Sequence, residues 1–478
     1  MVFSSPIFLF GFLPIVLIAY YSSPRPIKNF TLLLCSLLFY AWGEIFYLAV
    51  MLISILANYI FGLLIYQAHT SSTAQAKLYV TLGLAVNIIL LISFKYANFI
   101  TDNLNLLLTQ FRISNIDLAP VHLPLGISFF TFQAISYIVD IYRKEVPSQK
   151  NIFDLALYIS LFPQLIAGPI VRYHDVALQI TKRKHSVELF ASGAQRFIFG
   201  LAKKMLLANP LGEVADTVFA FSDDELSMPL AWIGILAYSL QIFFDFSGYS
   251  DMAIGLGRMF GFRFLENFNY PYIAKSLREF WQRWHISLST WFKDYVYIPL
   301  GGNRVSTVRV YANLFIVFVL TGFWHGASWN FLVWGLFHGI FLASEHAGAA
   351  KYIKKMWLPI QHGYLLLVVI ISWVFFRADT LTHATSYLTS MLNIFHYHTA
   401  TYQFAQVFSY EALYAFMLGI VLSTPIYPWL IAHFRTQNIL ASAILINIPK
   451  LALLTCLLLM SFLKIASSTY NPFIYFRF

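Results

Sequence analysis

The chain has 478 residues, of which 59% are hydrophobic and only 11% are charged. A water-soluble domain carries roughly a quarter charged residues, so this composition excludes an ordinary soluble protein and indicates an integral membrane protein in contact with lipid. The formal net charge of +10 does not indicate nucleic-acid binding, because the basic residues lie in short loops, as lysines and arginines do on the cytoplasmic side of membrane proteins.

Uncharged stretches long enough to cross a bilayer occur along the whole chain. They cover residues 2–21, 78–94, 357–376 and 412–434. A crossing needs about 20 apolar residues, and these stretches are apolar all round instead of alternating, so they predict helices and not barrel strands. The first stretch has no basic segment before it and no small-residue cleavage site after it, which predicts a retained span. Basic residues in the loop that follows, including Arg25 and Lys28, place the N-terminus on the extracytoplasmic side.

The sequence predicts a single membrane domain over residues 1–478. It contains no internal repeat, no low-complexity tract and no linker long enough to separate two folded units. Residues 467–478 form an aromatic C-terminal tail. Cys35 and Cys456 fall within apolar runs, so neither a disulfide framework nor a cysteine metal site is expected.

Residues 275–300 combine many charges with many aromatic side chains. Read as one helix, the segment has an apolar face and a largely polar opposite face, which predicts a helix in the membrane interface or one that re-enters the membrane. His285 lies on the apolar side. The apolar face consists of Leu277, Phe280, Trp281, Trp284, Leu288 and Trp291, and the polar face of Arg278, Glu279, Gln282 and Arg283.

Residues 310–344 contain no Asp, Glu, Lys or Arg. One continuous helix of this length would be about 52 Å long, too long for a single crossing without extreme tilt. We therefore expect a break, and Gly322 and Gly326 bracket the place for it. These glycines flank the pair Trp324 and His325.

Two histidines are the candidates for chemistry. An ionisable group at membrane depth is costly, which makes His325 and, more weakly, His285 functional candidates. An imidazole has an unperturbed pKa near 6.5 and can take a proton from an attacking hydroxyl. The alternative is structural: His325 would hydrogen-bond a carbonyl and His285 would only pack among aromatic rings. His338, His346 and His362 have no comparable context and are expected to be structural or interfacial.

Other chemistries lack their sequence patterns. Neither histidine belongs to an H-E-x-x-H or C-x-x-C pattern, so no metal site is expected. There is no G-x-S-x-G elbow, and the glycines at residues 255–257 have no strand before them, so a hydrolase or dinucleotide-binding interpretation fails.

Two strings resemble the membrane-bound O-acyltransferase family. They are FWQRWHISLSTWFKDYVYIPLGGNR at residues 280–304 and LTGFWHGASWNFLVWGLFHG at residues 320–339. The likeness includes MVFSSPIFLFGFLPI, SFFTFQAISYIVDIYR, LFPQLIAGPIVR and QIFFDFSGYSDMAIGLGRMFG, and it covers nearly the whole chain. The match is to the bacterial polymer-modifying branch, and within it the alginate type.

This resemblance implies an all-α bundle of about eleven transmembrane helices, with re-entrant segments around a central funnel. His325 matches the family histidine at the funnel floor, and His285 matches the second active-site position. The tail resembles an aromatic terminal motif in which Tyr475 would receive the acyl group before an extracellular partner takes it. An aromatic anchor at the membrane interface is the alternative role for this tail.

The implied activity is acyl transfer across the bacterial plasma membrane to a cell-envelope or exported polysaccharide. The expected donor substrate is acetyl-CoA from the cytoplasm, with no permanently bound cofactor. The expected partner is an extracytoplasmic SGNH-type acyltransferase. Alginate is the first expected acceptor and peptidoglycan the second. The alternatives are a lipid-modifying transferase of the same family, a transporter or flippase without acyl transfer, and a structural scaffold.

The polar residues around these strings have two candidate roles, binding of the donor phosphates or structural pairing. Pairing is the more common role for such groups. The candidates for donor binding are Arg278, Arg283, Lys293 and Arg304, and the string FDFSGYSD adds Asp245, Tyr249, Ser250 and Asp251.

Overall fold

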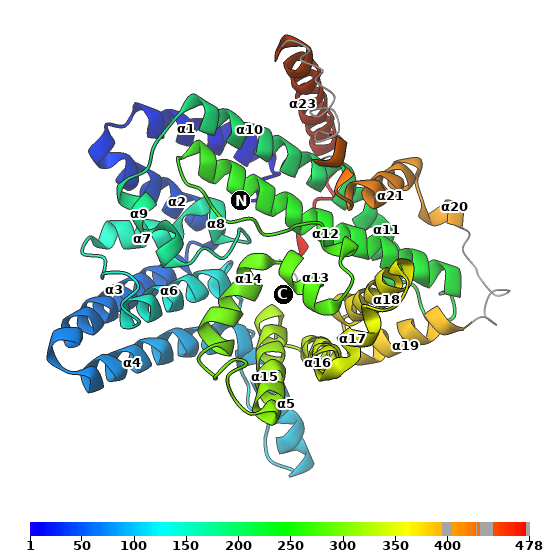
Figure 1. The fold of residues 1–478 in the computed structure, drawn as a ribbon, viewed down its shortest axis with the longest axis horizontal. Coiled ribbons are helices and arrows are strands. Elements are labelled where there is room, and N and C mark those ends of the chain that lie inside the picture. The colour runs from blue at the N-terminus through cyan, green and yellow to red at the C-terminus, as the bar shows by residue number, and fades with distance from the viewer. Residues whose placement is uncertain (394–403, 427, 431–442, 475–478) are drawn as a thin grey trace. The chain divides into compact units, whose positions relative to one another are not determined.

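The structure is a computed structural model that describes residues 1–393, 404–426, 428–430 and 443–474. The described residues form helices and no strands, as the apolar stretches predict (Figure 1). The chain divides into two compact units. Unit 1 comprises Met1–Ala194 and Ala253–Leu265, and unit 2 comprises Gln195–Met252 and Glu266–Phe478. That the whole chain acts as one domain stays a prediction.

Unit 1 contains both long and short helices. Labels with η mark 3-10 or π segments. In chain order the elements are η1 (Ile7–Phe12), α1 (Leu13–Ser22), η2 (Arg25–Ile27), α2 (Lys28–Glu44), α3 (Leu48–Ser71), α4 (Thr73–Leu91), η3 (Ile92–Tyr96), α5 (Ala97–Gln110), α6 (Ile127–Tyr142), α7 (Ile152–Ser160), α8 (Phe162–Leu165), α9 (Tyr173–Thr181) and the start of α10 (Val187–Ala202).

Unit 2 contains the segments that the sequence singled out. Its elements, after the end of α10, are η4 (Lys203–Ala208), α11 (Asn209–Phe219), most of α12 (Met228–Met259), η5 (Pro271–Ile273), α13 (Leu277–Arg283), α14 (Ile286–Phe292), η6 (Lys293–Tyr297), α15 (Thr307–His325), α16 (Trp329–Ser344), η7 (Glu345–Ala349), α17 (Ala350–Ile353), α18 (Leu358–Arg377), α19 (Leu381–Leu392), α20 (Phe404–Val407), α21 (Tyr410–Leu422) and α23 (Ala443–Ser467).

Six helices in the described part of the chain are long and apolar enough to cross a membrane. They are Leu48–Ser71, Thr73–Gln110, Met228–Met259, Thr307–His325, Leu358–Arg377 and Ile448–Ser467. The span expected at residues 78–94 falls within the second of them, and the one expected at residues 357–376 matches Leu358–Arg377 with a shift of one residue. The first expected span is the shorter apolar helix Ile7–Ser22, and Tyr410–Leu422 covers the described start of the last one. Many large apolar side chains on these helices are exposed, as lipid contact requires, for example Ile53, Ile18 and Leu463.

Helix α12 differs from the other long apolar helices because protein surrounds it. In its most apolar window 83% of the residues are buried, against 11–39% for the other five helices. Asp245 and Ser250 on this helix are buried together with its apolar residues. A carboxylate is tolerated in such a segment only where protein groups pair with it, so α12 brings polar groups into the interior of unit 2.

Helices α15 and α16 pack closely through glycines. A Cβ on Gly322 would lie 2.3 Å from the carbonyl oxygen of Phe331, and a Cβ on Gly335 would lie 2.3 Å from that of Phe318. The absence of side chains at these positions allows the two backbones to touch. The break predicted within residues 310–344 is confirmed, since α15 ends at His325 and α16 begins at Trp329.

Candidate active site

His325 lies at the last position of α15, directly before the break. Gly326, which follows it, is extended with φ of −166° and ends the helix. The His325 side chain is 5% exposed, and Trp324 before it is 4% exposed. This pair therefore lies inside the protein and not on a lipid-facing surface.

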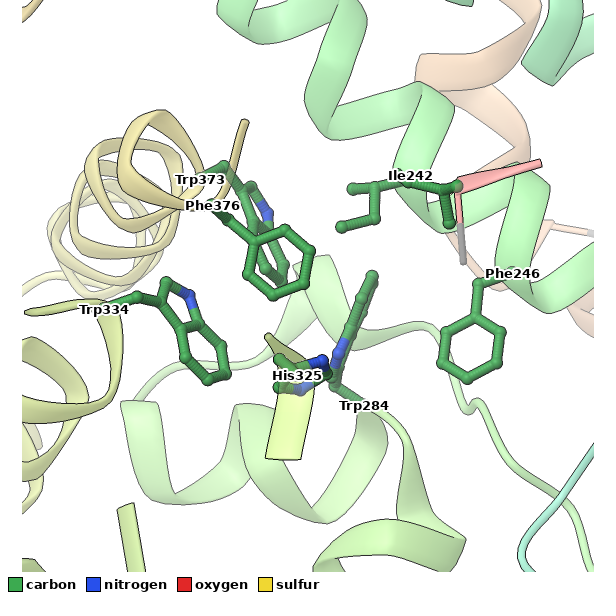
Figure 2. A pocket seen from close by; sticks show the side chains of 8 residues that line it. Ile242, Phe246, Trp284, His325, Trp334, Trp373 and Phe376 are labelled. Atoms are coloured by element: carbon green, nitrogen blue, oxygen red, sulfur yellow. The ribbon is translucent and has the colours of Figure 1, made fainter. Parts of the chain in front are cut away.

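The His325 ring lines a pocket within unit 2 whose walls are almost entirely aromatic (Figure 2). The ring centroids of Trp334 and Phe376 each lie 5.0 Å from that of His325, both nearly perpendicular to it. The other lining residues are Ile242 and Phe246 of α12, Trp284, Trp373 and Ile474. Such walls exclude water, which strengthens any polar interaction made inside the pocket.

His285 occupies a break between two short helices, where the sequence predicted one continuous helix. The backbone at His285 has φ of 43°, a left-handed conformation, and it separates α13 from α14. The single helix expected over residues 275–300 is therefore wrong at this point, although its predicted apolar face is buried as expected. Non-glycine residues in this conformation are uncommon and cluster at functional sites.

Trp324 connects the two histidines. Its ring centroid lies 5.9 Å from that of His285 and 5.0 Å from that of His325. His285 is fully buried, and the ring of Phe246 packs edge-on against it at 4.5 Å. The structure therefore brings the two predicted histidines into one aromatic cluster. His325 lines the pocket, and His285, which is not among the lining residues, contacts Trp324.

Two fixed contacts hold α13, which leads into His285. The Ser276 side chain caps its N-terminus by accepting a hydrogen bond from the backbone of Glu279. The buried carboxylate of Glu345 accepts from the backbone N–H groups of Leu277 at 2.7 Å and Arg278 at 3.1 Å. A carboxylate at a helix N-terminus is electrostatically favourable, so Glu345 fastens the re-entrant segment to the end of α16.

The four basic candidates lie outside the aromatic pocket. Arg278, Lys293 and Arg304 are exposed, and Arg283 is half-buried. Arg283 forms an ion pair with Glu279 at 2.9 Å, which agrees with the structural role considered for this group. Lys293 and Arg304 border the turn after α14, and none of the four side chains lines the pocket.

The described part of the tail, up to Ile474, is held inside unit 2. The backbone N–H of Ile474 donates to Asp245 at 2.9 Å, and Phe473 stacks on Tyr249 with ring centroids 4.6 Å apart. Lys204 donates to the carbonyl of Pro472 and forms a buried ion pair with Asp245 at 2.6 Å. Tyr475 lies outside the described residues. The residue before it nevertheless lines the His325 pocket.

Sequence reasoning missed several residues that hold this site. Asn267 is 1% exposed and contacts His285, and Lys204 is 2% exposed beside the tail. Neither residue belongs to a recognised sequence motif.

His338, which the sequence analysis expected to be structural or interfacial, is fully buried, and its ring centroid lies 4.9 Å from that of Trp334. In the FDFSGYSD string, Asp245 and Asp251 form ion pairs, the latter with Lys203 at 2.6 Å.

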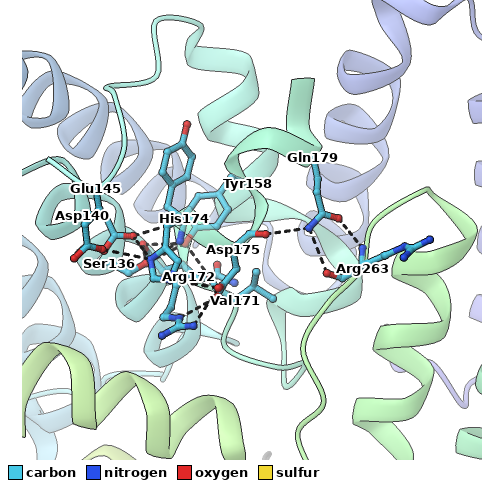
Figure 3. A network of polar contacts seen from close by, with 12 residues as sticks. Ser136, Asp140, Glu145, Tyr158, Val171, Arg172, His174, Asp175, Gln179 and Arg263 are labelled. Carbon is cyan, nitrogen blue, oxygen red and sulfur yellow. Dashed lines mark hydrogen bonds and ion pairs between the residues drawn. The ribbon is translucent and has the colours of Figure 1, made fainter. Parts of the chain in front are cut away.

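A second polar cluster lies in unit 1 (Figure 3). Asp140, Glu145 and His174 offer ligand atoms within 4.8 Å of one another. Both ring nitrogens of His174 face carboxylates, Nδ1 that of Asp140 at 3.0 Å and Nε2 that of Asp175 at 3.3 Å. Hydrogen bonds to these two carboxylates raise the pKa of His174 to about 9. The contacts of the protonated imidazole with these carboxylates form an ion-pair network.

Taken together, the described features define a class of protein: an all-helical membrane protein that holds a buried histidine in a water-excluding pocket. The family model for the membrane-bound O-acyltransferase family matches residues 142–382. The chain belongs to this family. It is an O-acyltransferase with multiple membrane spans, which decides against the transporter and scaffold alternatives.

Named relatives agree with this assignment. The chain is 41% identical over 503 aligned positions to "Probable alginate O-acetylase AlgI" of Azotobacter vinelandii, with 100% of both chains covered. It is 47% identical over 381 positions to the protein of that name from Pseudomonas aeruginosa, covering 80% of this chain and 73% of the relative. It is 38% identical over 431 positions to "Peptidoglycan O-acetyltransferase" of Helicobacter pylori, covering 82% of this chain and 80% of the relative.

Proposed function

We propose that the protein transfers an acetyl group from cytoplasmic acetyl-CoA, through the membrane, for O-acetylation of an exported polysaccharide of the alginate type. The observation that carries the mechanism is the buried His325 in the wall of a mostly aromatic pocket. Full-length similarity to the Azotobacter vinelandii relative supports the acceptor class. Because coenzyme A is polar and highly charged, only the acyl group would pass through the protein.

In this mechanism His325 acts as the general base. It takes the proton of the accepting hydroxyl while that oxygen attacks the thioester carbonyl, the carbon–sulfur bond breaks, and the thiolate of coenzyme A leaves and takes up a proton. His285 would orient a reacting group or stabilise the developing oxyanion. General-base catalysis contributes about 10²- to 10⁴-fold to the rate.

Tyr475 is the proposed first acceptor, which would pass the acetyl group to a partner outside the cytoplasm. Support comes from Ile474, which lines the His325 pocket, because consecutive Cα atoms are only about 3.8 Å apart. The proposed partner is an SGNH-type acyltransferase that places the group on the polymer. A partner outside the cytoplasm is consistent with the proposed orientation of this protein in the plasma membrane, in which the basic first loop, with Arg25 and Lys28, faces the cytoplasm.

Donor binding is proposed for Arg278, Arg283, Lys293 and Arg304. Three of these side chains are exposed, so they are free to meet the phosphates of coenzyme A, and guanidinium groups suit phosphate through paired hydrogen bonds. Arg283 is the weakest member of the set, because Glu279 already pairs with it.

A test uses membranes that contain the protein together with its polymer. His325→Ala should reduce transfer of labelled acetyl groups from acetyl-CoA by at least about 100-fold at unchanged protein level. The matched control is His383→Ala, which removes a partly exposed histidine on α19 outside the pocket. Full activity in His325→Ala membranes would refute the mechanism.

Peptidoglycan is the second candidate acceptor, and the Helicobacter pylori relative is the observation that favours it. The same membranes, supplied with either alginate or peptidoglycan and with the soluble partner, separate the two. Label in alginate alone supports the first proposal, and label in peptidoglycan alone replaces it with the second.

A further inference from the structure

The amide of Asn267 has only one orientation that satisfies its contacts. The backbone N–H of Ser287 lies 3.2 Å from Oδ1 of Asn267 and can only donate. The hydroxyl of Ser287 donates to the same oxygen at 2.9 Å. At the other end of the amide, Nδ2 of Asn267 donates to Ser250 on α12 at 3.0 Å. The atom that faces these donors is therefore the carbonyl oxygen.

This orientation decides the protonation of His285. Nδ1 of His285 lies 3.2 Å from the same carbonyl oxygen of Asn267 and 3.5 Å from the Ser287 hydroxyl, whose hydrogen is already donated to that oxygen over the shorter distance of 2.9 Å. An oxygen acceptor requires a donor, so Nδ1 carries the proton. A neutral imidazole has one N–H, and Nε2 consequently presents a lone pair. In the described part of the chain this buried Nε2 has no hydrogen-bond partner.

The surroundings of His285 favour the neutral ring. Apart from Asn267 and Ser287, its ring contacts are Phe246 of α12, Phe268 and Trp324 of α15. None of these groups titrates near neutral pH or carries a charge. A buried imidazolium without a carboxylate partner is costly.

We propose that Asn267 is a positioning residue that fixes His285 as the Nδ1–H tautomer, so that Nε2 accepts a hydrogen bond from a substrate N–H or O–H group. This inference rests on the proposed function and selects between the two roles given there for His285. A lone pair cannot stabilise an oxyanion, so His285 orients a substrate. The donated hydrogen belongs to an amide N–H or hydroxyl of the donor's pantetheine arm, because the phenol of Tyr475, the proposed first acceptor, has only the one hydroxyl that His325 deprotonates.

The first experiment reads the tautomer without any activity measurement. Nitrogen NMR of histidine-labelled protein in nanodiscs should show one ring with protonated Nδ1 and bare Nε2 that disappears in His285→Gln. Asn267→Leu should change this signal, whereas Asn313→Leu should not, because Asn313 is an equally buried asparagine whose amide donates to Leu300 and Gly302. A His285 signal with protonated Nε2 would overturn the inference, whether or not acetyl transfer occurs.

The second experiment measures the pH dependence of transfer. In Asn267→Asp a carboxylate beside Nδ1 would favour the imidazolium, which has no lone pair at Nε2. Activity at pH 7 should fall and recover at alkaline pH, with the acidic limb displaced upward by about 1 to 3 pH units. An equal loss at every pH would indicate only structural damage and would contradict the positioning role.

Kinetics of Asn267→Leu then identify the group that His285 holds. A rise in KM for acetyl-CoA supports a contact between His285 and the donor's arm. An unchanged KM for acetyl-CoA, with a normal pH profile, would overturn the proposal.

Discussion

His174 is a charged residue that stabilises a short helix outside the membrane-spanning segments. It lies in α9, which is too short to cross a membrane, and its ring bridges the carboxylates of Asp140 and Asp175 (Figure 3). These contacts raise its pKa from 6.5 to about 9. The protonated ring therefore favours the folded state.

The pH dependence of this effect follows from the direction of the shift. A raised folded-state pKa contributes stability that is fully present below pH 6.5 and is lost as the pH rises through about 9. His174→Gln should lower the unfolding temperature in detergent at pH 6 and have little effect at pH 10. Thermal unfolding at both pH values checks this, with His383→Gln as the control. An equal effect at both values would contradict the ion-pair role.

Tyr475 carries the most specific chemical prediction at the residue scale. If its phenol receives the acetyl group, peptide mass analysis of protein trapped with acetyl-CoA should find acetyl on Tyr475, and Tyr475→Phe should abolish both this modification and polymer acetylation. Tyr470→Phe is the matched control, since the Tyr470 phenol donates to Asp216 at 2.6 Å and has a structural role. Normal turnover in Tyr475→Phe would remove the residue from the mechanism.

At the scale of elements, the α15–α16 pair depends on backbone contact. Gly335→Ala would place a methyl group 2.3 Å from a carbonyl oxygen of α15, and overpacking of this kind costs about 1–3 kcal/mol. We expect a lower unfolding temperature. We also expect reduced transfer, because α15, which the new methyl group would displace, carries His325 at its end.

The control is the same substitution in α18. Nothing lies within 4 Å of a Cβ on Gly363, so Gly363→Ala should be neutral or stabilise the protein by about 0.5–1 kcal/mol. Equal unfolding temperatures for the two variants would show that the glycine contact is unimportant.

The sequence predicted some elements and missed others for physical reasons. The break after His325 was predictable, because an uncharged stretch too long for one crossing must be interrupted. The break at His285 was not, since hydrophobic periodicity gives the buried face of a helix but not a single left-handed residue within it. Asn267 lies 18 positions before His285 in an irregular segment, where only the tertiary fold brings the two together.

At the scale of the whole molecule, the tail depends on a buried ion pair. Lys204 and Asp245 are almost completely buried, and each also binds the tail backbone. Removing one partner leaves the other charge unpaired, so Lys204→Met or Asp245→Leu alone should cost about 3–5 kcal/mol of stability.

The double variant separates stability from tail docking. Lys204→Met with Asp245→Leu should be more stable than either single variant, because no buried charge remains. It should still loosen the end of the tail, since the contacts of Lys204 and Asp245 with the backbone of Pro472 and Ile474 are lost. Unfolding temperature and the rate of proteolytic cleavage within residues 467–474 measure the two effects. A double variant with a protected tail would contradict the anchoring role.

The place of Ile474 in the pocket wall also bears on biosynthesis. A nascent chain can insert α12, α15 and α18 and still lack one side of the His325 pocket until residues 470–474 leave the ribosome. The wall of this pocket is thus completed only after the helices that carry its other lining residues have all been translated.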